Sequence, residues 1–559
     1  MASLLHVLLL WPLVLGSLVA AGEDEDKPLV DTKYGKVRGI VAAVKDTERT
    51  VHAFYGIPFA KPPTGPLRFA APEPPEPWSS VREASTYPAM CLQDPQVLHA
   101  LNDSFNFKFQ TSFSEDCLYL NVFTPAKRKS DAKLPVMFFI HGGGLQMGGT
   151  VLFEGSALCA SEDVVVVVPQ YRLGMLGFLS SEDGQDTGNY GLLDQVKALE
   201  WVRDNIESFG GDPKSVTVFG ESAGGFSVSA LMLSPLARGL FHRGIAESGV
   251  VDSFLFEDKK DKDISKIRNL VANLSSCDAA SLVDCLRKKS EAEISAISQG
   301  LVIKGPVMFY ARVDGEFLPR SPVELLLQKD VAPVPFMMGV NNHECGWMFP
   351  KALKVSGLID GMDKTVTRAT LEKIKIQPEA VPLVMDEYFH GVEDPLKIRD
   401  IFLDLWGDLS FVMPALRVAN YHRDSGFPVY FYEFQHRPSL LKGQRPDFVK
   451  ADHADELFFV TGGPFLRDGV LFSGLFTEEE KLLSKTVMKY WANFARSGDP
   501  NGPGLVSWPQ YQQDEDYLEI GLQQHAAKKL RSDKFQFWTQ TLPEKLKILS
   551  DASTSKKEQ

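Results

Sequence analysis

The chain contains, near its middle, the stretch Gly220-Glu221-Ser222-Ala223-Gly224, an instance of the pattern Gly-x-Ser-x-Gly. In this pattern the serine sits on a tight turn between a strand and a helix, where a side chain at the glycines would collide with the neighbouring chain. An apolar run over 215–219 precedes it as a strand, and 223–232 can begin a helix. The pattern alone arises by chance in roughly one of four such sequences, but this setting makes Ser222 a candidate nucleophile.

The segments around this stretch alternate between strand and helix patterns. Strand character predicts strands over 136–140, 164–168, 215–219, 335–340 and 428–434. Apolar residues recur at helical spacing over 192–206, and a run of glycines and a proline at 210–213 ends that helix. Strands joined by helices indicate a parallel sheet. We therefore expect an α/β-hydrolase fold, with a mostly parallel central sheet, helices on both faces and large insertions.

Residues 23–559 are expected to form a single catalytic domain, because α/β folds with long insertions can remain one unit. The alternation weakens from Ala230 to about Gln328, where helical segments would form a cap or regulatory insertion over the sheet. The last 60 residues have a helical pattern that ends in a polar tail.

A serine hydroxyl is a weak nucleophile, so it needs a base, an acid that orients the base, and donors for the oxyanion. The expected fold carries these groups in the order serine, acid, histidine. Glu344 follows the strand over 335–340 closely enough to be the acid. His436 and His453 both follow the strand over 428–434, and spacing alone does not choose between them.

The oxyanion donors are predicted in a second glycine run, His141-Gly142-Gly143-Gly144, at the end of the strand over 136–140. Consecutive glycines let backbone N–H groups approach a substrate oxygen. We expect the amides of Gly143, Gly144 and Ala223 to form a three-donor oxyanion hole, with Gly142 shaping the turn.

Composition and charge exclude several other functions. The 559 residues are 44% hydrophobic and 23% charged, which is ordinary for a globular protein. A net charge of −13 would repel a phosphate backbone, so nucleic acid is not an expected partner. The run His-Ala-Asp-Glu over 453–456 lacks the spacing of zinc ligands, and the chemistry needs no metal or organic cofactor.

The N-terminus predicts a cleavable signal peptide over residues 1–22. The apolar stretch 4–21 ends in small residues before an acidic segment, and Pro12 and Gly16 interrupt it. No later segment has the ~20 uninterrupted apolar residues of a spanning helix, so we expect no transmembrane anchor. In the secretory pathway the sequons at Asn102 and Asn273 become candidate glycosylation sites.

The same compartment allows disulfides between the six cysteines. Local pairing would join Cys91 to Cys117 and Cys277 to Cys285, leaving Cys159 and Cys345 free. Six cysteines allow 15 connectivities, so spacing does not settle the pairing.

Longer motifs resemble the mammalian carboxylesterase family over nearly all of the chain that follows the predicted signal peptide. Two of them are more specific than a five-residue pattern: Phe219-Gly220-Glu221-Ser222-Ala223-Gly224-Gly225 and Ser114-Glu115-Asp116-Cys117-Leu118-Tyr119-Leu120-Asn121-Val122. Further matching runs lie over 54–60, 171–174, 188–195 and 489–496. The run over 88–94 is most similar to the carboxylesterase 2 type.

The resemblance implies roles for individual residues. Glu344 falls on the family's acid and His453 on its base, which favours His453 over His436. Glu221 and Ser248 fall on positions that support the triad. The resemblance also implies the disulfides Cys91–Cys117 and Cys277–Cys285. Cys345 departs from relatives, which carry a bulky aromatic side chain after the acid, and we do not expect it to be a catalytic thiol because no base is committed to it.

We therefore expect a serine carboxylic-ester hydrolase that acts on apolar esters through an acyl-enzyme on Ser222. The expected substrates are xenobiotic esters, with acylglycerols or other lipid esters as further candidates. The alternatives are a specialised lipid or acylcarnitine hydrolase and, from another class, a non-catalytic adhesion protein with a cholinesterase-like fold. A choline esterase is less favoured, because residues 91–117 contain no tryptophan for a quaternary ammonium. The acyl preference, the alcohol preference and the oligomeric state stay open.

The C-terminus leaves two locations open. Retained family members end in a His-x-Glu-Leu type signal, whereas this chain ends Ser555-Lys556-Lys557-Glu558-Gln559. The lumen of the endoplasmic reticulum and secretion are therefore about equally expected.

Overall fold

The computed structural model describes residues 27–95, 112–129, 131–180, 187–256, 262–304, 307–374 and 376–555. The predicted signal peptide and the sequon at Asn102 lie outside the described residues. Among the described helices none is long and apolar enough to cross a membrane.

The centre of the structure is an eleven-stranded sheet with the order β16-β15-β14-β13-β12-β11-β9-β10-β8-β4-β3. Its strands are β3 (Ile40–Ala43), β4 (Thr50–Pro58), β8 (Tyr119–Pro125), β9 (Leu134–Ile140), β10 (Val165–Pro169), β11 (Gly211–Glu221), β12 (Arg243–Glu247), β13 (Phe336–Asn341), β14 (Val429–Phe434), β15 (Asp516–Ile520) and β16 (Gln524–Lys528). Pairing is parallel from β10 through β15 and antiparallel at both edges. The predicted mostly parallel sheet is confirmed.

Short strands lie outside this sheet: β1 (Leu29–Thr32), β2 (Gly35–Arg38), β5 (Arg82–Glu83), β6 (Met90–Cys91) and β7 (Phe113–Ser114). The helices are α3 (Ser156–Glu162), α4 (Gly174–Phe178), α5 (Tyr190–Asn205), α6 (Ala223–Leu233), α7 (Lys262–Ser275), α8 (Leu282–Arg287), α9 (Glu291–Lys304), α10 (Pro322–Leu327), α11 (Met348–Ala352), α12 (Lys364–Lys373), α13 (Val381–Phe389), α14 (Pro395–Gly407), α15 (Met413–Asp424), α16 (Leu457–Val460), α17 (Glu478–Ser497), α18 (Ser532–Gln536) and α19 (Leu542–Ser555).

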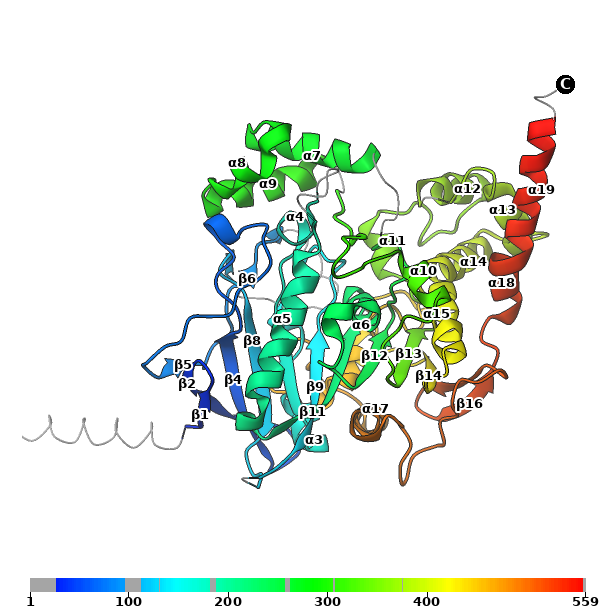
Figure 1. Cartoon of the computed structure of the whole chain (residues 1–559). Coiled ribbons are helices and arrows are strands. Elements are labelled where there is room, and N and C mark those ends of the chain that lie inside the picture. The colour runs from blue at the N-terminus through cyan, green and yellow to red at the C-terminus, as the bar shows by residue number, and fades with distance from the viewer. Residues whose placement is uncertain are drawn as a thin grey trace, which may run out of the picture.

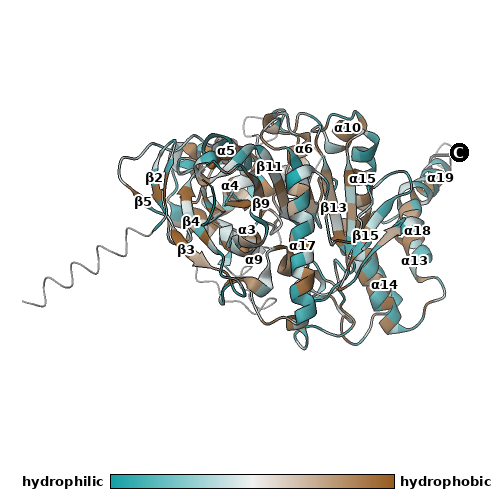
Figure 2. Cartoon of the chain, turned by 90° about the horizontal axis from the view of Figure 1, so that it is seen from below, coloured by the Kyte–Doolittle hydropathy of each residue, from teal (hydrophilic) through white to brown (hydrophobic). Residues whose placement is uncertain are grey.

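The central strands are apolar throughout because both of their faces are buried. Alternate residues of β9 point to opposite sides: Val136 and Phe138 join one apolar cluster, and Met137 and Phe139 join another. Helix α5 packs in the first cluster, and α17 packs in the second, where it lies across the strands (Figure 2). The core therefore has one layer on each face of the sheet.

Between residues 230 and 328, where a cap was predicted, helices α7, α8 and α9 lie together at the top of the molecule (Figure 1). Two expectations about this and the last region were wrong. Strand β12 lies where only helical segments were expected, and β15 and β16 form an antiparallel edge hairpin within the last 60 residues. Strand β16 is largely exposed, so it lacks the apolar pattern that marks a buried strand.

Candidate active site

Ser222 lies at the turn between β11 and α6, with φ 58° and ψ −120°. A left-handed backbone is costly for a residue with a side chain, and such strain concentrates at functional sites. The turn is held because Ser222 N donates a hydrogen bond to Glu247 O at 2.8 Å. The flanking glycines are required by space: a Cβ at Gly220 would lie 2.4 Å from Ile140 O, and one at Gly224 only 1.9 Å from it.

His453 and Glu344 come from loops that follow β14 and β13, and both side chains are buried. Nδ1 of His453 lies 2.7 Å from Oε2 of Glu344. The other oxygen of Glu344 accepts a hydrogen bond from Asn341 N at 2.7 Å, which fixes the carboxylate. The imidazole is therefore oriented by the acid that follows β13.

The second imidazole nitrogen faces Glu221, the residue before Ser222. Nε2 of His453 lies 3.0 Å from Oε1 of Glu221, yet neither atom has a hydrogen-bond partner of acceptable geometry in the described part of the chain. Burial lowers the pKa of His453, but the two carboxylates of Glu221 and Glu344 outweigh burial and raise that pKa well above its usual range. The two carboxylates thus stabilise the positive charge that the imidazole gains when it accepts a proton.

His436, the other candidate base, lies elsewhere. Its Nε2 is 3.0 Å from Oε1 of Glu480, the residue that also closes the capping box of α17 with Thr477. His436 does not line the cavity that contains Ser222 and His453.

The glycine run after β9 lies beside Ser222. Gly142, Gly143 and Gly144 line the same cavity, and φ is 105° at Gly143 and 63° at Gly144. The ring of His141 stacks on Tyr171 with centroids 4.3 Å apart, and its Nδ1 lies 2.9 Å from Gly142 O. Burial lowers the pKa of His141 to about 4, so the ring is neutral at pH 7 and Nδ1–H can donate to that carbonyl.

The cavity has a volume of about 680 Å³ and is lined mainly by apolar side chains. Those from separate elements include Leu173, Met175, Leu176, Leu301, Met308 and Phe349. Ser222, His453 and Glu221 are among its polar lining residues. Apolar pockets with a few placed polar groups are typical of small-molecule sites.

Several buried acids around the site were missed by the sequence analysis. Asp452, next to His453, accepts hydrogen bonds from the backbone N–H groups of Gly346, Trp347 and Met348 at 3.1, 3.2 and 2.9 Å. It therefore joins the loop of the base to the loop of the acid. Its only sequence signal is its position beside His453.

Glu247 and Glu456 lie close enough to Glu221 for their charges to interact. Burial and the charge of Glu221 raise the pKa of Glu247 to about 8, although a hydrogen bond from Trp491 partly lowers it. This pKa favours the neutral form of Glu247 at pH 7. Burial also raises the pKa of Glu456. Ser248, a predicted supporting residue, is buried at the end of β12 with φ 47°, and its hydroxyl has no partner among the described residues.

The structure contains the disulfides Cys91–Cys117 and Cys277–Cys285. Cys159 and Cys345 are free and buried, and burial raises the pKa of both thiols. Asn273 is exposed on α7. In the described ranges no group of His, Cys, Asp and Glu side chains could hold a metal ion.

Comparisons with known proteins agree with this geometry. A sequence model described as "Carboxylesterase family" matches residues 26–538. The chain is 50% identical to a fatty acyl-CoA hydrolase precursor, medium chain, of Anas platyrhynchos over 545 residues, which is 96% of this chain and 95% of that protein. It is 48% identical to an acylcarnitine hydrolase of Mus musculus over 548 residues, 96% of this chain and 95% of that protein.

A third relative is the cocaine esterase of Homo sapiens, with 48% identity over 543 residues, 95% of this chain and 94% of that protein. Mammalian carboxylesterases of rat and pig match at 45–46% identity. The protein is therefore a serine ester hydrolase with an α/β-hydrolase fold.

The turn at Ser222 predicts a strong effect of Gly224→Ala. The added Cβ would meet Ile140 O at 1.9 Å, so β9 and α6 must separate. We expect a loss of about 3 kcal/mol or more in the free energy of unfolding, measured by urea denaturation. Gly474→Ala is the control, since its Cβ would meet nothing closer than 3.9 Å. Equal stability of the two variants would contradict this account.

Proposed function

The chain belongs to the carboxylesterase family, and we propose that it hydrolyses apolar esters through an acyl-enzyme formed on Ser222. The observation that carries the proposal is that three features line one large apolar cavity: a serine on a strained turn, the imidazole of His453, and the glycine run after β9. His436 is not among the residues that line this cavity.

In the proposed first step, neutral His453 removes the proton from Ser222 as its oxygen attacks the ester carbonyl. The amides of Gly143, Gly144 and Ala223 stabilise the oxyanion, and Gly142 shapes the turn. The imidazolium then lies between Glu344, 2.7 Å from Nδ1, and Glu221, 3.0 Å from Nε2. Imidazolium gives its proton to the leaving alcohol, and a water activated by His453 releases the acid.

The substrate class follows from the cavity. Aliphatic and aromatic walls and a volume of about 680 Å³ favour an apolar acyl or alcohol group, such as a xenobiotic ester or an acylglycerol. The second candidate is a lipid ester or thioester with a long acyl chain. It is supported by the names of the relatives, a medium-chain fatty acyl-CoA hydrolase and an acylcarnitine hydrolase.

We also propose the remaining assignments from the sequence. Residues 23–559 would form one catalytic domain behind a signal peptide over 1–22, and the protein would enter the secretory pathway. Asn273 is accessible for a glycan on α7. Retention in the endoplasmic reticulum and secretion remain equal alternatives, and fractionation of expressing cells against medium separates them.

The central assignment predicts that Ser222→Ala loses about 10⁵-fold in kcat on p-nitrophenyl esters, because the covalent step is removed. His453→Gln should lose a comparable factor. His436→Gln is the matched control for the histidine, and we expect its kcat to stay within about twofold of wild type because it only bonds Glu480. A wild-type rate in Ser222→Ala, or a large loss only in His436→Gln, would refute the assignment.

The position of Glu221 predicts a pH effect. His453 must be neutral to act as base, and the negative charge of Glu221 raises its pKa. Glu221→Gln should therefore move the acid limb of the kcat/KM profile to lower pH. It should also reduce kcat at its optimum by about 10- to 100-fold, because the imidazolium loses one anion.

Glu247→Gln is the control for this shift, since burial raises the pKa of Glu247 to about 8 and the carboxylates that raise the pKa of His453 are those of Glu221 and Glu344. Its acid limb should coincide with that of wild type. If the acid limb of the Glu221→Gln profile stays in place or moves to higher pH, Glu221 does not raise the pKa of His453.

A further inference from the structure

The cap supplies part of the wall of the ester cavity. Ser298 and Leu301 of α9 line that cavity. The disulfide Cys277–Cys285 joins the segment after α7 to α8, so α7, α8 and α9 form a linked group (Figure 1). The position of α9 relative to the sheet therefore sets one dimension of the cavity.

Arg68 connects the body of the protein to the end of α8. It follows the short helix η1 (Gly65–Leu67) and is only 3% exposed. Its Nε and Nη2 donate to the two carboxylate oxygens of Glu115 at 2.6 and 2.5 Å. Its Nη1 donates to the carbonyl oxygens of Leu286 and Lys289, the latter at 2.9 Å. One planar guanidinium thus holds two segments in a fixed relation.

Two cap residues complete the connection. Arg287 of α8 donates from Nε to Arg68 O at 3.0 Å and from Nη2 to Phe69 O at 3.1 Å. Oε2 of Glu291, the first residue of α9, accepts from Ser114 Oγ and from Glu115 N, each at 3.0 Å. We call Arg68, Glu115, Arg287 and Glu291 the cap clamp.

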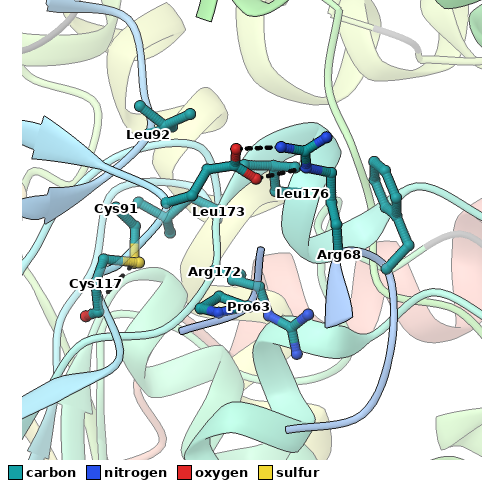
Figure 3. A pocket seen from close by; sticks show the side chains of 10 residues that line it. Pro63, Arg68, Cys91, Leu92, Cys117, Arg172, Leu173 and Leu176 are labelled. Carbon is teal, nitrogen blue, oxygen red and sulfur yellow. Dashed lines mark hydrogen bonds and ion pairs between the residues drawn. A yellow bond between two sulfur atoms is a disulfide. The ribbon is translucent and has the colours of Figure 1, made fainter. Parts of the chain in front are cut away.

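The cap clamp lies directly behind a wall of the ester cavity. A small cavity of about 10 Å³, near the volume that one water needs, lies beside Arg68 and Glu115. Its lining includes Leu92, Leu173 and Leu176, which also line the ester cavity. Figure 3 shows these leucines together with Arg68 and the disulfide Cys91–Cys117. These three leucines therefore lie between the Arg68–Glu115 pair of the clamp and the ester cavity.

We propose that the cap clamp is a positioning element that determines the length of acyl or alcohol chain the enzyme accepts. The inference rests on the proposed function of the cavity. Glu291 and Leu301 are ten residues apart, or roughly 15 Å along a helix, so a tilt of a few degrees at the clamped end moves Leu301 by about 1 Å. A buried ion pair adds little net stability because desolvation offsets its attraction, whereas the fork of Arg68 fixes geometry.

The position of α9 matters only to a substrate long enough to reach it. A short ester is held by Ser222 and the glycine run, which the clamp does not contact. A long chain extends to Leu301 and the leucine wall. Loosening the clamp should therefore weaken the binding of long esters and leave the chemical step on short esters unchanged.

The test compares p-nitrophenyl acetate with p-nitrophenyl decanoate in wild type, Arg68→Lys and Glu291→Ala, at a temperature where all variants are folded. Arg68→Lys keeps the positive charge but loses the paired guanidinium hydrogen bonds to Glu115. Glu291→Ala removes the hydrogen bonds from Ser114 and Glu115 at an exposed position of α9. We expect kcat on acetate within twofold of wild type and a 5- to 20-fold rise in KM for decanoate in both variants.

Glu293→Ala is the matched control. Glu293 is an exposed carboxylate in the same turn of α9, but its bonds go to Lys289 and Ser290 within the cap. Its ratio of decanoate KM to acetate KM should stay within twofold of wild type. An unchanged ratio in both clamp variants, or an equal change in Glu293→Ala, overturns the proposal. Acetate turnover that Ser222→Ala abolishes tests the proposed function separately.

Discussion

The left-handed backbone at Ser222 constrains everything around it. A non-glycine residue in such a conformation costs about 1–3 kcal/mol, so neighbouring contacts must impose it. The bond from Ser222 N to Glu247 O ties the turn to β12, and the close approach of Gly220 and Gly224 to Ile140 O ties it to β9. The strained residue is therefore fixed by parallel strands on both sides of β11. Ser222 is thereby held where it lines the ester cavity.

The electrostatics of the site depend on carboxyl groups that are buried near the imidazole of His453. Glu221 and Glu344 flank His453, while Glu247 and Glu456 lie behind Glu221. Burial and the neighbouring carboxylates raise the pKa of Glu247 to about 8 and raise the pKa of Glu456 well above its ordinary value, because a low-dielectric region disfavours several adjacent charges. Glu221 and Glu344 are the carboxylates within 3.0 Å of the imidazole nitrogens. This arrangement favours the charge that His453 gains when it accepts a proton.

The sequence predicted the parts of the structure that depend on local pattern. The buried strands β9, β10, β13 and β14 are continuous apolar runs, and glycine motifs marked the turns at their ends. Strand β12 was missed because its five residues begin with an arginine and end with a glutamate. Strand β15 was missed because Asp516 and Glu519 interrupt its apolar pattern, and β16 was missed because it is largely exposed.

Side-chain contacts across distant segments had no such pattern. Spacing gave no preference between His436 and His453 as the base. The structure separates them, because Nε2 of His436 is paired with Glu480, which lies 44 residues further along the chain. The approach of Glu221 to Nε2 of His453 depends on how β11 and the loop after β14 meet in space. The catalytic roles of Ser222, Glu344 and His453 remain predictions that the geometry supports.

Asp452 has a consequence for how the base is positioned. By binding three backbone amides after Glu344, it holds together the two loops whose strands, β13 and β14, are neighbours in the sheet. The chain between these loops runs through α11 to α15, yet its two ends are fixed locally. This excursion also reaches the base directly, because the ring of Phe411 packs on the ring of His453 with centroids 4.6 Å apart. The imidazole is therefore positioned both by the link that Asp452 makes at the ends of the excursion and by an aromatic side chain from its middle.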